Sequence, residues 1–127
     1  MSVQTILVVA DEPVTRNLIV HVLTGRGYRV YEADSETEAD ILCKALGPSA
    51  FNLVIADHEI GNCAGRAVAE RVLRCCPAAK VLQVAVLTYQ TLQAQDGLVK
   101  DGSFLQRPFT PAQLLDAVES ALDPRMQ

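Results

Sequence analysis

Two patterns of hydrophobic and polar positions alternate along the chain. Short runs rich in apolar residues are typical of strands buried in a sheet, and they occupy residues 5–9, 28–33, 51–56, 81–85 and 103–105. Between these runs, apolar residues recur every three or four positions, which is typical of helices packed against a core. The pattern therefore predicts five βα units in succession.

Capping residues mark where several predicted helices begin. Ser35 opens one helix in a capping box with Glu38, and Thr110 opens the last helix with Pro111 at its first position. A less clear helix lies over residues 88–99. The spacing predicts that the following side chains face the core: Val14, Leu18, Ile19, Val22 and Leu23; Ile41, Leu42, Ala45 and Leu46; Val68, Val72 and Leu73; and Leu114, Leu115, Val118, Ala121 and Leu122.

Alternating strands and helices of this length predict an α/β fold, in which a parallel sheet is covered by helices on both faces. The chain shows no internal repeat, linker or low-complexity stretch, so we expect a single domain over residues 1–127, with no output domain. In such sheets the functional site lies at the carboxyl ends of the strands. The residues that directly follow each strand are therefore the ones to examine.

Composition excludes several classes of protein. Half of the 127 residues are hydrophobic, which is enough for one core and too much for a disordered chain. The net charge of −4 argues against binding nucleic acid through the domain's own surface. No apolar run approaches the ~18 residues of a membrane span, and the first residues lack the features of a signal peptide. We therefore expect a cytoplasmic protein.

The four cysteines show no spacing typical of a metal site. Only Cys75 and Cys76 are close in sequence, while Cys43 and Cys63 stand apart, and no pair forms a C-x-x-C motif. With two histidines in the chain, no combination fits a zinc site. We expect free thiols in a reducing compartment.

Charged residues follow three of the predicted strands. Asp11 and Glu12 come after the first strand, Asp57 after the third and Arg107 after the fifth. Carboxylate oxygens above a parallel sheet are suited to Mg²⁺ beside a phosphoryl group, and a nearby cation stabilises phosphoryl oxygens. The sequence therefore predicts a site for phosphoryl chemistry at this edge.

Three segments give the chain a resemblance to a known family. They are ILVVADEPVTR at residues 6–16, FNLVIADHEIGNCAG at 51–65 and FLQRPFTPAQLLDAV at 104–118, each at a strand end and in this order. With them the chain resembles the response regulator receiver domains of two-component signalling over nearly its whole length. The resemblance implies a non-enzymatic signalling module with a flavodoxin-like (βα)5 fold, a three-layer sandwich whose central five-stranded parallel sheet has the order 2-1-3-4-5.

The resemblance also implies roles for individual residues. Asp57 stands at the phosphoacceptor position, where a carboxylate takes a phosphoryl group from a histidine kinase, a phosphotransfer protein or a small phosphodonor. Asp11 matches the second member of the family's acidic pair, which binds Mg²⁺ directly or through water. Glu59 would lend its backbone carbonyl to that metal.

The chain departs from the family pattern at several polar positions. Ala10 replaces the first acid of the pair, Ala85 replaces the switch Ser/Thr unless Thr88 takes that place, and Arg107 replaces the lysine. The aromatic switch position is kept as Phe104. Loss of one carboxylate weakens metal binding by about 10–100-fold, whereas the planar, permanently charged Arg107 can bind Asp57 through two nitrogens.

Three functional hypotheses follow. The first is a degenerate receiver that is phosphorylated weakly or not at all and signals by binding a downstream protein. The partner would bind the face formed by the fourth helix, fifth strand and fifth helix, where the candidate contacts are Val86, Leu87, Leu92 and Leu98. The second is a competent, Mg²⁺-dependent phosphoacceptor. The third, a flavodoxin-like enzyme or FMN binder, is disfavoured because carboxylates follow the first strand where a phosphate would lie. The receiver can be a monomer or a homodimer.

Simpler structural roles remain open for some of these residues. Asp11 can act as the N-cap of the first helix while Glu12 points to solvent, and Asp57 can cap a helix. His58 is expected to have no role. The Arg107–Pro108 bond is a candidate for a cis peptide, which the family often has there.

Overall fold

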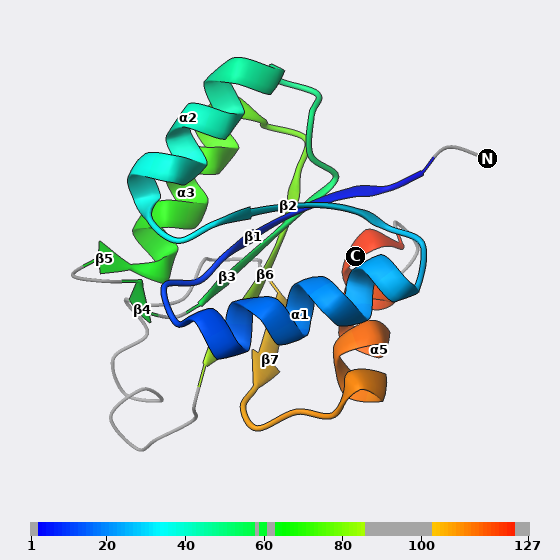
Figure 1. Ribbon diagram of the computed structural model, residues 1–127. Coiled ribbons are helices and arrows are strands. Elements are labelled where there is room, and N and C mark those ends of the chain that lie inside the picture. The colour runs from blue at the N-terminus through cyan, green and yellow to red at the C-terminus, as the bar shows by residue number, and fades with distance from the viewer. Residues whose placement is uncertain (1–2, 58, 61–62, 86–102, 124–127) are drawn as a thin grey trace.

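The computed structural model describes residues 3–57, 59–60, 63–85 and 103–123, and its centre is a five-stranded parallel sheet. The sheet has the order β2-β1-β3-β6-β7, which is the predicted 2-1-3-4-5 order counted over the strands of this sheet (Figure 1). Its strands are β1 (Thr5–Val9), β2 (Arg29–Ala33), β3 (Leu53–Asp57), β6 (Lys80–Ala85) and β7 (Ser103–Gln106). The predicted fold class is therefore confirmed.

In the described part of the chain, two helices cover each face of the sheet (Figure 1). One pair is α1 (Pro13–Gly25) and α5 (Pro111–Leu122), and the other is α2 (Glu36–Leu46) and α3 (Gly65–Cys75). The predicted helix over residues 88–99 and the candidate contacts Val86, Leu87, Leu92 and Leu98 lie outside the described residues, as do His58 and Thr88.

Alternate residues of the strands contribute side chains to two separate hydrophobic layers. In β1, Leu7 and Val9 pack with α2 and α3, whereas Ile6 and Val8 pack with α1 and α5. This division follows from the two-residue period of a strand, which sends successive side chains to opposite faces. It also explains why the four residues of β1 that follow Thr5 are all apolar and buried, since both faces of the sheet are covered.

Helix caps are formed by side chains close to the predicted positions. The Ser35 hydroxyl accepts from the Glu38 backbone N–H, and Thr110 forms a full capping box with Gln113. The first helix differs from the sequence-based alternative: its N-cap is Glu12, whose carboxylate accepts from the Thr15 backbone N–H, and not Asp11. Glu12 reaches this N–H because its longer side chain folds back over the first turn.

Several residues predicted to face the core are exposed. Val14 is 73% and Leu18 43% exposed in α1, while Ile41 is 60% and Leu46 42% exposed in α2, where Ala45 is exposed as well. The buried residues of α2 are the smaller Ala39 and Cys43, because α2 packs closely against α3 as well as the sheet. The positions of the large apolar residues therefore did not identify the buried face of α2.

A short antiparallel pair of strands lies between β3 and α3. It consists of β4 (Glu59–Ile60) and β5 (Cys63–Ala64). The peptide bond between Arg107 and Pro108 is cis, as the resemblance indicated. In the described part of the chain, no helix combines the length and the apolar character that crossing a bilayer requires.

Candidate functional site

Asp57 ends the central strand β3 and is the key polar residue at the carboxyl edge of the sheet. It is 6% exposed and one of two buried polar residues found among the described side chains. Parallel pairing of β3 with β1 and β6 brings Asp57 beside the ends of these strands, at Ala10 and Ala85. The structure thus gathers the predicted strand-end residues at one edge.

Arg107 follows β7 and forms an ion pair with Asp57. Its Nη2 lies 3.3 Å from Asp57 Oδ1, and its side chain is 30% exposed. The ion pair is formed through Nη2, and the buried Nε of Arg107 has no hydrogen-bond partner in the described part of the structure. Nε therefore takes no part in the contact with the carboxylate and is left as a buried N–H donor.

The first position of the family's acidic pair brings no charge to the site. Ala10 is 1% exposed, and its carbonyl oxygen accepts a hydrogen bond of 2.8 Å from Arg16 Nη1. Arg16 Nε pairs with Glu32 at 3.1 Å. Sequence reasoning missed Arg16, whose position one turn into α1 is the signal that could have placed it near this edge.

The two acids after β1 have different surroundings. Asp11 is exposed, and the structure places it at the predicted edge of the sheet. Glu12 is engaged as the cap of α1, and the Thr15 backbone N–H lowers the pKa of its carboxyl group. The positive charge of Arg107 lowers this pKa further, which places Glu12 within reach of the field of Arg107.

The remaining predicted positions lie on the expected elements. Glu59 belongs to β4, two residues after Asp57, and Ala85 is the last residue of β6. Phe104 lies in β7 and is half-buried. Ala85 offers no hydroxyl at the end of its strand.

The described carboxylates are of the kind that bind Mg²⁺ in proteins. Magnesium is bound in proteins by one or two carboxylates together with water and phosphate oxygens, and Asp11 and Asp57 can supply this number. The guanidinium of Arg107 already neutralises Asp57, and Ala10 adds no negative charge. The site is therefore less attractive to a divalent cation than a site with three acids.

Comparison with known proteins supplies the family. The model of the response regulator receiver domain matches residues 6–119. The chain belongs to this family. Receivers are signalling modules of two-component systems and not catalytic enzymes; they interact with histidine kinases and typically bind Mg²⁺. No curated protein matches the chain.

Solved receiver structures share the fold of this chain. A receiver protein from Sinorhizobium medicae is 26% identical, with 98% of each chain covered and a TM-score of 0.81. The chemotaxis protein CheY4 of Vibrio cholerae is 21% identical, with 95% of this chain and 100% of that chain covered and a TM-score of 0.80. A receiver domain from Clostridium thermocellum is 22% identical, with 97% of each chain covered and a TM-score of 0.81.

The structure also brings together three cysteines that their sequence spacing separates. Cys43, Cys75 and Cys76 are free, and their sulfur atoms lie within 4.8 Å of one another. Burial, followed by charge on the other two sulfurs, raises the pKa of Cys43 to about 12, and burial also raises the pKa of Cys76. For these three cysteines the expectation of free thiols is confirmed, whereas the view that only Cys75 and Cys76 are close is wrong in space.

Proposed function

We propose that this receiver has kept the phosphoacceptor position at Asp57 but works with a degenerate site, so that phosphorylation is weak or absent and the domain signals by binding another protein. The observation that carries this proposal is the ion pair between Asp57 and Arg107 beside the uncharged Ala10. Ala10 removes a negative charge that helps to hold the metal in a competent receiver, and Arg107 keeps the positive charge of the usual lysine but presents it on a planar guanidinium paired with Asp57.

The chemistry of the carboxylate explains the expected loss. Phosphorylation needs Asp57 to attack phosphorus as a nucleophile, while positive charge stabilises the phosphoryl oxygens. Mg²⁺, held by Asp11 and Asp57, would supply that charge. Arg107 instead binds Oδ1 of this carboxylate in the resting state, which lowers the reactivity of the carboxylate and competes with the metal.

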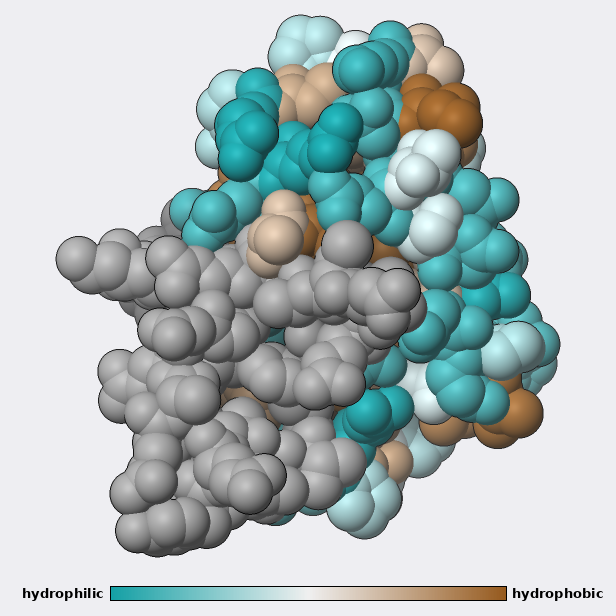
Figure 2. All heavy atoms as spheres, turned by 90° about the vertical axis from the view of Figure 1, so that its left-hand side faces the viewer, coloured by the Kyte–Doolittle hydropathy of each residue, from teal (hydrophilic) through white to brown (hydrophobic). Residues whose placement is uncertain are grey.

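The face formed by β7 and α5 is the proposed contact surface for a partner protein. A hollow of about 330 Å³ lies on this face, lined by Leu105, Gln106, Pro108, Gln113 and Asp116. It begins one residue from Arg107, so a partner seated there would lie close to the ion pair. The described surface in Figure 2, which views another side, is largely hydrophilic and offers apolar residues mainly in separated patches.

A competent phosphoacceptor is the second candidate, and one observation favours it. The buried Nε of Arg107 has no partner among the described residues, and a phosphoryl oxygen on Asp57 could accept its hydrogen bond. In that case Arg107 would replace part of the charge that the metal supplies. The two candidates differ in whether Asp57 forms a stable adduct.

Intact-mass spectrometry separates these candidates. The protein is incubated with a small phosphodonor with and without Mg²⁺, beside an Asp57→Asn control and an ordinary receiver that labels. We expect little or no adduct on the wild-type chain. Mass is the suitable readout because the chain has no tryptophan for the usual fluorescence assay.

A restored variant tests the cause of the loss. Ala10→Asp combined with Arg107→Lys and Ala85→Thr returns the acid, the lysine and the hydroxyl of the family pattern, so this triple variant should gain a Mg²⁺-dependent adduct. A full adduct on the wild-type chain that requires Mg²⁺ and vanishes in Asp57→Asn would reject the degenerate site and establish the competent one.

A further inference from the structure

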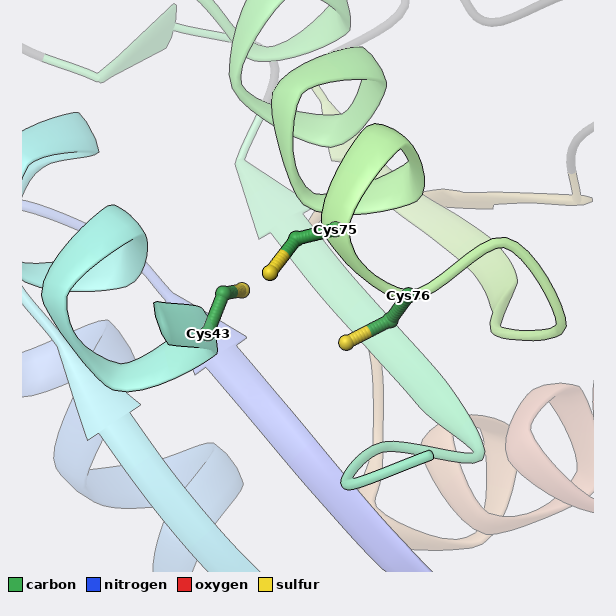
Figure 3. Close-up of side chains that lie close together, drawn as sticks. All are labelled: Cys43, Cys75 and Cys76. Atoms are coloured by element: carbon green, nitrogen blue, oxygen red, sulfur yellow. The ribbon is translucent and has the colours of Figure 1, made fainter. Parts of the chain in front are cut away.

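Three cysteine thiols meet at the packing interface of α2 and α3. Cys43 projects from α2, Cys75 ends α3 and Cys76 follows directly, and in Figure 3 the Cys43 and Cys75 side chains point toward one another across the interface. All three sulfurs lie within 4.8 Å of one another. Cys43 and Cys76 are 1% and 0% exposed, whereas Cys75 is half-buried.

The backbone holds this arrangement in place. Gly47, which caps α2, donates its N–H to the Cys43 carbonyl at 3.0 Å and accepts a hydrogen bond of 3.4 Å from Cys76 Sγ. Farther along the same interface, Arg71 of α3 pairs with Glu36 and Asp40 of α2. The sulfurs are thus fixed from both helices before any ligand arrives.

The spacing of the sulfurs matches that of a single three-coordinate ion. With metal–sulfur bonds of about 2.3 Å, three sulfurs lie about 4 Å apart around a planar three-coordinate centre and somewhat closer around a pyramidal one such as trivalent arsenic. Small side-chain rotations would bring the three sulfur atoms from their separations of up to 4.8 Å to these distances. We propose that Cys43, Cys75 and Cys76 form a three-sulfur site for one thiophilic, trivalent metalloid of the arsenite class.

Charge balance selects the trivalent class. Three bound thiolates carry a charge of −3, so a monovalent ion would leave −2 and a divalent ion −1 in a largely buried site, which is costly without a partner. The described cations on these helices do not compensate, because Arg71 and Lys44 pair with Glu36 and Asp40, and Arg74 is exposed. A trivalent centre leaves the site neutral.

The reaction needs no redox partner. Neutral arsenous acid, As(OH)₃, exchanges its three hydroxyl groups for three thiols: three As–O and three S–H bonds break, three As–S bonds form, and three water molecules leave. Oxidation states do not change. The half-buried Cys75 offers the first sulfur to an incoming reagent, after which the two buried thiols complete the site.

Non-denaturing mass spectrometry of the reduced chain with arsenite tests the proposal, with Zn²⁺ and Cd²⁺ in parallel titrations. We expect one arsenic per chain with the loss of three water molecules, tighter binding than for either divalent ion, and a higher Tm because the ligand binds the folded state. Absence of an adduct, or a divalent ion that binds more tightly, would overturn the trivalent site.

Cysteine variants locate the site. Cys75→Ser removes the half-buried thiol, so it should fold and bind arsenite at least tenfold more weakly, in an adduct that retains one hydroxyl group. Cys43→Ala should do the same from the other helix. Cys63→Ser is the matched control, because Cys63 lies in β5 before the opposite end of α3 and should leave binding unchanged. Unchanged binding in Cys75→Ser, or lost binding in Cys63→Ser, would contradict the assignment.

Discussion

At Asp57, a carboxylate that is almost fully buried is compensated by a guanidinium that is only partly so. The contribution of such a pair to the free energy of unfolding lies between two known limits. Exposed ion pairs contribute about 0–1 kcal/mol, whereas removing one partner from a buried pair costs about 3–5 kcal/mol because the other charge is left without compensation. The contribution of Arg107 should therefore be intermediate.

Replacing Arg107 by methionine keeps much of the side-chain volume but removes the charge. We expect Arg107→Met to lower the free energy of unfolding by ~1–3 kcal/mol at neutral pH, since Asp57 then lacks its ion-pair partner. Urea unfolding followed by circular dichroism measures this change.

Asp57→Asn provides the matched control for this pair. Because the amide carries no charge, Arg107→Met should cost much less in the Asp57→Asn background, and the double-mutant cycle should give a coupling of more than about 1 kcal/mol. Additive effects of the two substitutions would show that the ion pair contributes nothing to stability.

Glu12 makes stability depend on pH in acid solution. Its pKa is lowered in the folded protein, first by the Thr15 backbone N–H, so its carboxylate stabilises the fold at pH values above the unfolded pKa of about 4.5. This contribution is lost as the pH falls through the lowered folded pKa. We therefore expect Glu12→Gln to be less stable than the wild type at pH 7 and the difference to disappear in strong acid. Urea titrations across this range test it, and a difference that does not vary with pH would contradict the capping role.

At the scale of the elements, strands were easier to predict than helix faces. The bounds of β1 were predicted correctly because a continuous apolar run can only be buried on both faces of a sheet. In α1 the apolar positions cover more of the circumference than the core does, so Val14 and Leu18 were assigned to the core but are exposed. Which part of a wide apolar face is covered depends on neighbouring elements that the local pattern does not contain.

Leu18 and Leu23 test this difference within one helix. Leu23 is fully buried and Leu18 is 43% exposed. We expect Leu23→Ala to lower the free energy of unfolding by ~2–5 kcal/mol through lost burial and a cavity, and Leu18→Ala by less than about 1 kcal/mol. Equal losses in urea unfolding would mean that Leu18 is covered in solution.

The contacts of the candidate site and of the cysteine cluster show the same difference between strands and helices. The meeting of Asp57 and Arg107 was predictable because parallel strands place their carboxyl ends at one edge. The approach of Cys43 to Cys75 and Cys76 was not, because it depends on how α2 packs against α3. Sequence order therefore indicates which strand ends meet, but it does not show which faces of two helices touch.

At the scale of the whole molecule, the sheet separates two hydrophobic layers and also joins them. Each interior strand contributes side chains to both layers, as β3 does with Val54 on one side and Ile55 on the other. Because the same strands bound both layers, unfolding of the strands on one side would expose the apolar side chains of the other layer to solvent. This arrangement predicts that the described core unfolds as one cooperative unit.

Val72 and Val118 allow a matched test of that cooperativity. Val72 of α3 lies in one layer and Val118 of α5 in the other, and both are at most 1% exposed. We expect each valine-to-alanine substitution to destabilise by ~1–3 kcal/mol without changing the urea dependence of the unfolding free energy.

Two tyrosines report on the layers separately. Tyr31 packs against the layer of Val72, and Tyr28 packs against the layer of Val118. In urea titrations followed by the NMR signals of labelled tyrosine, both native signals should vanish at one midpoint, and either alanine variant should lower that midpoint for both residues. If Val72→Ala lowered the urea midpoint for the Tyr31 signal alone, the two layers would unfold independently. The sheet would then not couple the face of α2 and α3 to the face of α1 and α5. Such coupling is what any signal passing from the cysteine cluster to the β7–α5 surface would require.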